Sequence, residues 1–72
     1  MKLIIPMERD MYGLKLIAIN VDREPVMDFR DEVIGDKEKR LMIELKGPYK
    51  GGEHTLELLL EKGVYRKYTF KV

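Results

Sequence analysis

The second half of the chain alternates between apolar and charged residues with a period of two. Three segments show the pattern, at residues 40–46, 53–61 and 64–72. Such alternation is typical of half-buried β-strands. The positions expected on their inner sides are Leu41, Ile43, Leu45, His54, Leu56, Leu58, Leu60, Val64, Arg66, Tyr68, Phe70 and Val72.

Turn residues separate these three strands. The run from Gly47 to Gly52 contains three glycines and a proline and therefore predicts a loop. Lys62 and Gly63 lie between the last two strands, where Gly63 can supply a positive φ. The sequence therefore predicts a tight C-terminal hairpin.

The first half predicts strands with less regular patterns. Residues 2–7 read as an opening strand, in which Pro6 favours an edge position. Residues 14–21 are apolar on both faces and predict a central strand. A two-residue turn at Asp22 and Arg23 would follow. The register of that hairpin would pair Leu16 with Phe29 and Ala18 with Met27.

Residues 28–39 allow two readings. A hairpin through Ile34-Gly35-Asp36-Lys37 would set Glu32 opposite Lys39 and Asp31 opposite Arg40, two pairs of opposite charge. Alternatively, a short helix would run from Pro25 to Gly35. We favour the strands.

Six to seven short strands joined by turns predict one all-β domain over residues 1–72, a small antiparallel sandwich. The alternatives are a small β-barrel, or an α+β fold with one short helix near residues 25–35. The expected core is Leu16, Ala18, Phe29, Leu41, Ile43, Leu45, Leu56, Leu58, Leu60, Tyr68 and Phe70.

Two stretches carry a resemblance to a known family. The run Gly52-Glu53-His54-Thr55-Leu56-Glu57-Leu58, with Gly63 and Lys67-Tyr68-Thr69-Phe70-Lys71-Val72, resembles the last hairpin of small immunoglobulin-like modules. Residues 19–26 are similar to their early hairpin. The resemblance implies an immunoglobulin-like sandwich and no particular chemistry.

Composition narrows the class further. Charged residues make up 38% of the chain, yet its net charge is only +1, and Ser, Gln and Cys are absent. Lys, Glu and Arg supply the polar surface, a bias found in hyperthermophile proteins, so we expect a thermostable domain. No apolar run resembles a signal peptide or a membrane span. We therefore expect a cytoplasmic protein, or a domain excised from a larger one.

Catalytic and cofactor chemistry finds little support in the sequence. Without Ser or Cys, a nucleophile–base triad lacks its usual nucleophile. His54 is the only histidine, and without a second ligand a structural role is the better expectation. The resemblance implies a bond to the corner loop, which a Tyr at this position often forms in immunoglobulin-like modules. The acidic residues between Asp22 and Asp36 lack the spacing of a calcium-binding loop. We expect no enzyme, no metal and no cofactor.

The expected function is a non-catalytic interaction or scaffold module that binds a protein partner or self-associates through a sheet face or edge. Apolar residues at outward positions would form that surface: Ile17, Ile19, Met42, Leu59 and Tyr65.

Nucleic-acid or polyanion binding is the alternative function. Residues 37–72 carry a net charge of +4, against −3 for residues 1–36. The contacts would be Tyr49, Lys50, Tyr65 and Lys67. The nearly neutral whole disfavours nucleic acid as the partner.

Overall fold

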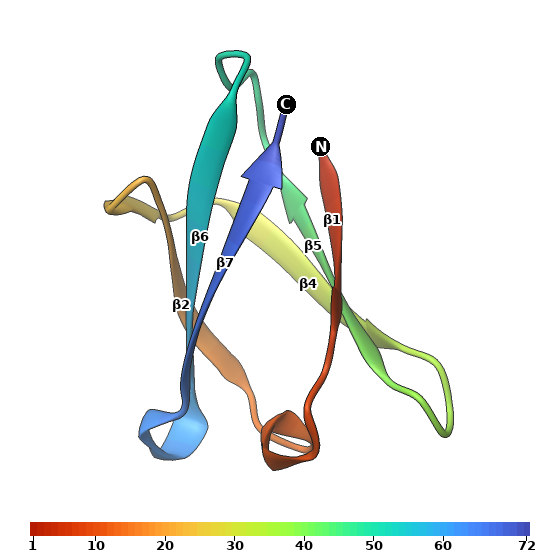
Figure 1. Cartoon of the computed structure of the whole chain (residues 1–72). Coiled ribbons are helices and arrows are strands. Elements are labelled where there is room, and N and C mark those ends of the chain that lie inside the picture. Colours follow the sequence, from red (N-terminus) through yellow and green to blue (C-terminus); the bar gives the residue numbers. More distant parts are fainter.

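The computed structural model describes all 72 residues, which form two antiparallel sheets (Figure 1). The strands are β1 (Lys2–Pro6), β2 (Leu16–Val21), β3 (Glu24–Val26), β4 (Phe29–Ile34), β5 (Arg40–Leu45), β6 (Glu53–Leu60) and β7 (Tyr65–Lys71). Two 3-10 turns are η1 (Arg9–Met11) and η2 (Glu61–Gly63). One sheet has the order β1-β5-β4 and the other β3-β2-β6-β7.

The architecture is an open β-sandwich of seven strands, as the sequence predicted. The two sheets share no paired strands, so the alternative of a closed barrel is wrong. The alternative of a helix near residues 25–35 is also wrong, because β3 and β4 occupy that segment. No helix in the chain has the length and apolar character needed to cross a membrane.

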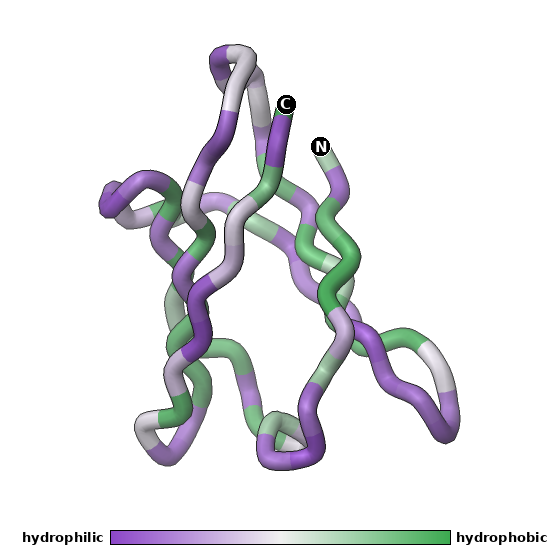
Figure 2. Tube along the Cα trace, in the orientation of Figure 1, coloured by the Kyte–Doolittle hydropathy of each residue, from purple (hydrophilic) through white to green (hydrophobic).

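The core lies between the sheets. Hydrophobic and hydrophilic positions alternate along the strands in Figure 2, and the hydrophobic ones of the central strands face inward. The buried residues are Ile5, Met11, Ile19, Val21, Leu41, Ile43, Leu45, Leu56, Leu58 and Leu60. The last six were predicted. Of the other predicted core residues, Leu16, Phe29, Tyr68 and Phe70 are half-buried and pack against this cluster.

A β-bulge in β2 changes which side chains enter the core. Leu16 pairs with Leu60 and Ala18 with Leu59, so Ile17 is an extra residue in the ladder. An extra residue inverts the alternation of everything that follows it. Ala18 therefore lies exposed on the outer face, and its prediction as a core residue was wrong.

The hairpin of β2 and β3 has the predicted turn but ends early. Asp22 and Arg23 both adopt positive φ, 51° and 66°, as a type I′ turn requires. Pairing stops at Val26, and Met27 is 91% exposed. The predicted pairs Leu16–Phe29 and Ala18–Met27 are therefore wrong.

Phe29 begins a strand of the opposite sheet instead. There it pairs with Leu45, and its ring packs against the core. The chain crosses between the sheets at Met27 and Asp28, because the apolar inner row of β5 gives Phe29 a better-buried position than the edge of β2 does.

The strands β4 and β5 form the favoured hairpin in a different register. Ile34 pairs with Arg40, so residues 35–39 form a five-residue loop rather than a two-residue turn. Glu32 faces Met42, and the predicted pairs of Glu32 with Lys39 and Asp31 with Arg40 are wrong. Apolar contact between Val33 and Leu41 outweighs the exposed charge pairs, which are worth little.

The C-terminal hairpin follows the predicted strands closely. His54 pairs with Phe70 and Leu58 with Arg66. Its turn contains three residues, and both Lys62 and Gly63 have positive φ, at 64° and 73°. Gly63 therefore has the conformation that the sequence predicted.

Candidate interaction surface

The outer face of the four-stranded sheet carries an apolar patch at the end nearest η2. Leu59 in β6 pairs with Tyr65 in β7 on one side and with Ala18 in β2 on the other. Leu59 is 41% exposed and Tyr65 is 48% exposed. We call Ile17, Ala18, Leu59 and Tyr65 the outer patch.

The bulge in β2 adds Ile17 to this patch. As the extra residue of the ladder, Ile17 is displaced outward and is 58% exposed. The bulge also explains why one prediction was wrong. Ile19 was expected on the outer face, but it is buried, because the inverted alternation points its side chain into the core opposite Leu58.

Part of the outer patch borders a depression of about 170 Å³. Its lining is Ala18, Asn20, Glu57, Leu58, Leu59 and Tyr65. The Tyr65 hydroxyl donates a hydrogen bond of 2.6 Å to the Glu57 carboxylate, which holds the ring in place. The same bond raises the pKa of Tyr65, since it favours the protonated phenol. A fixed aromatic ring beside a depression is the kind of feature that anchors an interface.

Met42, the remaining predicted surface residue, belongs to another face. It is half-buried on the outer side of the three-stranded sheet, between Ile4 in β1 and Glu32 in β4. The structure thus brings Ile17, Leu59 and Tyr65 together and separates Met42 from them.

The residues of the polyanion alternative fall into two separate groups, because Tyr65 and Lys67 share the exposed face of β7 while Tyr49 and Lys50 lie in the loop before β6. Tyr49 is half-buried and packs edge-on against His54 and Phe70, with ring centroids 5.7 Å and 6.3 Å away. Lys50 is exposed two residues before Gly52, whose backbone pairs with that of Val72. Tyr65 lies seven residues before Val72 in the C-terminal strand. At about 3.3 Å per residue, that spacing is about 23 Å.

His54 has the structural role that the sequence favoured. Its Nδ1 lies 2.5 Å from a carboxylate oxygen of Asp22, and its Nε2 lies 2.6 Å from the carbonyl oxygen of Lys50. Asp22 also accepts a hydrogen bond of 3.0 Å from the backbone N–H of Thr55. The imidazole therefore ties the β2–β3 turn to the loop before β6.

Both partners of the imidazole are hydrogen-bond acceptors, so only the doubly protonated ring satisfies them at once. Accordingly, the bond to Asp22 and then the bond to Lys50 raise the pKa of His54. The bond from His54, followed by that from Thr55, lowers the pKa of Asp22.

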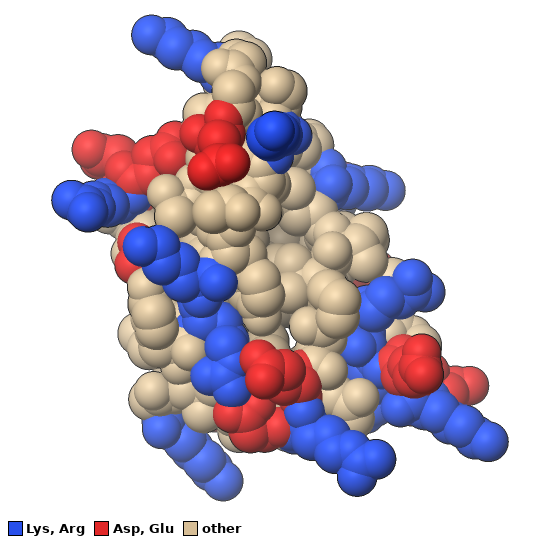
Figure 3. All heavy atoms as spheres, viewed as in Figure 1, with Lys and Arg blue, Asp and Glu red and all other residues tan.

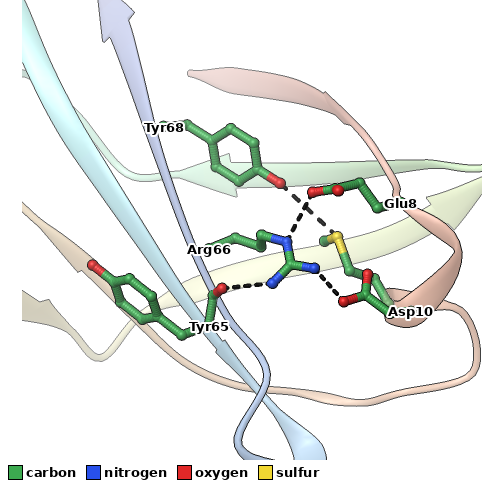
Figure 4. Close-up of polar contacts among 6 residues, drawn as sticks. Glu8, Asp10, Tyr65, Arg66 and Tyr68 are labelled. Atoms are coloured by element: carbon green, nitrogen blue, oxygen red, sulfur yellow. Dashed lines mark hydrogen bonds and ion pairs between the residues drawn. The ribbon is translucent and has the colours of Figure 1, made fainter.

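One charged cluster was not predicted from the sequence. Arg66 occupies an inner-face position of β7, and its guanidinium donates to Glu8 at 2.8 Å and also to Asp10 (Figure 4). It donates further to the carbonyl oxygen of Tyr65 at 2.8 Å. The cluster closes the end of the sandwich beside Met11, whose sulfur lies 3.9 Å from the Tyr68 hydroxyl. The local sequence pattern could not reveal this cluster, because Glu8 and Asp10 lie 58 and 56 residues before Arg66 in the chain.

No group of three or more His, Asp or Glu side chains is placed to hold a metal ion. Comparison with protein-family models, curated protein sequences and solved structures finds no match for this chain. The two sheets and the exposed residues define the protein as an antiparallel β-sandwich with an apolar patch on its larger sheet.

Proposed function

We propose that this domain is a non-catalytic interaction module that binds a second copy or a protein partner through the outer face of its four-stranded sheet. The observation that carries the proposal is the gathering of Ile17, Leu59 and Tyr65 on that face. Contiguous exposed apolar groups of this kind mark interaction sites on small proteins.

We further propose that the sandwich is immunoglobulin-like. In that fold strands A, B, E and D form one sheet, and C and its additions, F and G form the other. Labelling β1 to β7 as B, C, C′, D, E, F and G reproduces the orders B-E-D and C′-C-F-G. Strand A has no counterpart. The order supports the resemblance carried by the C-terminal hairpin.

Sedimentation velocity over micromolar to millimolar concentrations tests the proposed surface. We expect concentration-dependent association that Leu59→Lys and Ile17→Lys abolish without loss of thermal stability. Met27→Lys is the matched control, because Met27 is the most exposed apolar residue and lies off the outer patch. A monomer at every concentration, with solubility that neither patch variant changes, would refute this surface.

Heparin retention under increasing salt separates this proposal from the polyanion alternative. Binding through the apolar outer patch predicts no salt-dependent delay. Retention that Lys50→Glu and Lys67→Glu both remove would favour the alternative instead.

A further inference from the structure

The strand β1 has a free edge. Met1 and Leu45 exchange two hydrogen bonds, of 2.9 Å and 2.8 Å, and the Met7 N–H donates to the Lys39 carbonyl at 3.0 Å. Hydrogen-bonded pairs alternate along an antiparallel ladder, so the amide groups of Lys2 and Ile4 point away from β5. No other strand pairs with β1 on that side.

An apolar groove runs beside this edge. It has a volume of about 250 Å³ and lies between β1 and β7, which run in opposite directions (Figure 1). Its lining is Leu3, Ile4, Ile5, Pro6, Leu56, Tyr68, Thr69 and Phe70. Figure 3 looks onto this side, where uncharged atoms lie between β7 and β1. Basic side chains project on both flanks, and acidic side chains gather at the lower end.

The edge is weakly protected against pairing. Edge strands are usually guarded by inward charges, bulges or proline. Here Leu3, Ile4 and Ile5 carry no charge, and the ladder with β5 has no bulge. Lys2 and Pro6 are the only guards; they stand at the two ends of the strand, and Pro6 removes one donor.

The charges beside the groove that lack a close partner are basic and favour an acidic occupant, because Glu8 and Asp10, which follow β1, are both bound by Arg66. Lys2 stands at one end of β1, and Lys67 and Lys71 stand exposed on β7. Neither lysine of β7 forms an ion pair, and Lys2 has only a contact of 3.9 Å to Glu44. The acidic residues paired with these lysines lie one strand further from the groove, on β5 and β6.

We propose that this groove binds an extended segment of a partner protein, with alternating apolar and acidic residues, which adds to β1 as an antiparallel strand. The inference rests on the proposed function as an interaction module and names a second surface and its partner chemistry. Residues of the added strand opposite Leu3 and Ile5 face the groove, and those opposite Lys2 and Ile4 carry the acids. A second copy of β1 fits poorly, because its only charged residue is Lys2.

The probe is a capped, fluorescent heptapeptide of sequence Glu-Val-Glu-Val-Glu-Val-Glu, titrated by fluorescence anisotropy. The matched peptide replaces every Glu by Lys. Amide hydrogen exchange read by NMR locates the bound strand, since the Ile4 N–H is free in the unbound domain. We expect the acidic peptide to bind, the basic one not to bind, and the Ile4 amide to become protected.

Two substitutions at one position test the backbone pairing. Ile4→Pro removes an N–H that the fold does not use and should weaken peptide binding by about tenfold, the effect of losing one hydrogen bond. Ile4→Ala keeps that N–H and should retain binding. Circular dichroism checks that both variants fold.

The charge preference has its own test. The double substitution of Lys2→Glu and Lys71→Glu should abolish binding of the acidic peptide and create binding of the basic one. This exchange of preference cannot arise from a loss of folding.

Several outcomes overturn the proposal. No binding of either peptide at millimolar concentration would do so, as would equal binding of both. Binding unaffected by Ile4→Pro, with protection confined to the outer patch, would assign the peptide to the other surface. Protection of Ile4 that rises with protein concentration alone would make a second copy the occupant. In each case the sedimentation results for Leu59→Lys still decide the proposed function separately.

Discussion

Replacing Leu58 by Ala should lower the free energy of unfolding by about 3 kcal/mol. Leu58 lies in β6 with none of its surface exposed, opposite Ile19 in β2 and Arg66 in β7. Three lost carbons at about 0.8 kcal/mol each remove about 2.4 kcal/mol of transfer free energy. The unfilled space adds to this, and measured changes of this type span about 2–5 kcal/mol. At about 0.05–0.15 kcal/mol per residue, the 72-residue domain has only about 4–11 kcal/mol in total.

The matched control is Leu59→Ala, the same chemical change one residue further along the strand. Leu59 points to the opposite face and is 41% exposed, so its replacement should cost about 0.5 kcal/mol. Urea denaturation followed by circular dichroism measures both variants. A loss of about 3 kcal/mol corresponds to a melting temperature lower by about 12–24 °C in a domain of this size. Equal losses in the two variants would refute the assignment of the sheet faces.

Three further predictions concern pH, a turn and temperature. The raised pKa of His54 stabilises the fold below its ordinary value of about 6.5, and that contribution disappears as the pH rises through the folded value. The lowered pKa of Asp22 stabilises the fold above about 3.9 and is lost as the pH falls through its folded value, so urea titrations should show greatest stability between about pH 4 and 6.5. His54→Phe should remove the alkaline decline, and an unchanged profile would contradict the assignment. Gly63→Val should lower the melting temperature far more than Lys62→Ala. A β-branched residue resists a φ of 73°, whereas alanine adopts the φ of Lys62 about as readily as lysine does. Equal, small shifts in the two variants would contradict the predicted turn. The domain should melt above the mesophile range of about 45–65 °C. Added salt should lower the melting temperature, because it screens the ion pairs of Arg66 with Glu8 and Asp10. A melting temperature inside the mesophile range would contradict the expected thermostability.

The local sequence pattern was sufficient to predict the buried positions wherever one strand face is apolar and the other is charged. The inner rows of β5 and β6, from Leu41 to Leu60, follow from alternation alone, because burial selects one face of a half-buried strand. The turns at Asp22–Arg23 and at Gly63 also follow from local chemistry, since few residues tolerate positive φ. The structural role of His54 was expected because it is the only histidine and the sequence places no second metal ligand beside it.

Pattern failed where both faces of a segment are apolar. In β2 alternation cannot show which of Ala18 and Ile19 enters the core, and the bulge at Ile17 decided it. Met27 likewise gave no sign that the chain would leave one sheet for the other at that point.

The sequence by itself determined the fold class, most of the core and two of the turns, because these depend on neighbouring residues along one strand. Only the tertiary structure decided the strand order, the outer patch and the groove between β1 and β7, because each joins residues from distant strands. Arg66 is the clearest case. Its partners Glu8 and Asp10 lie near the other end of the chain, and packing of the two sheets alone brings them within hydrogen-bonding distance.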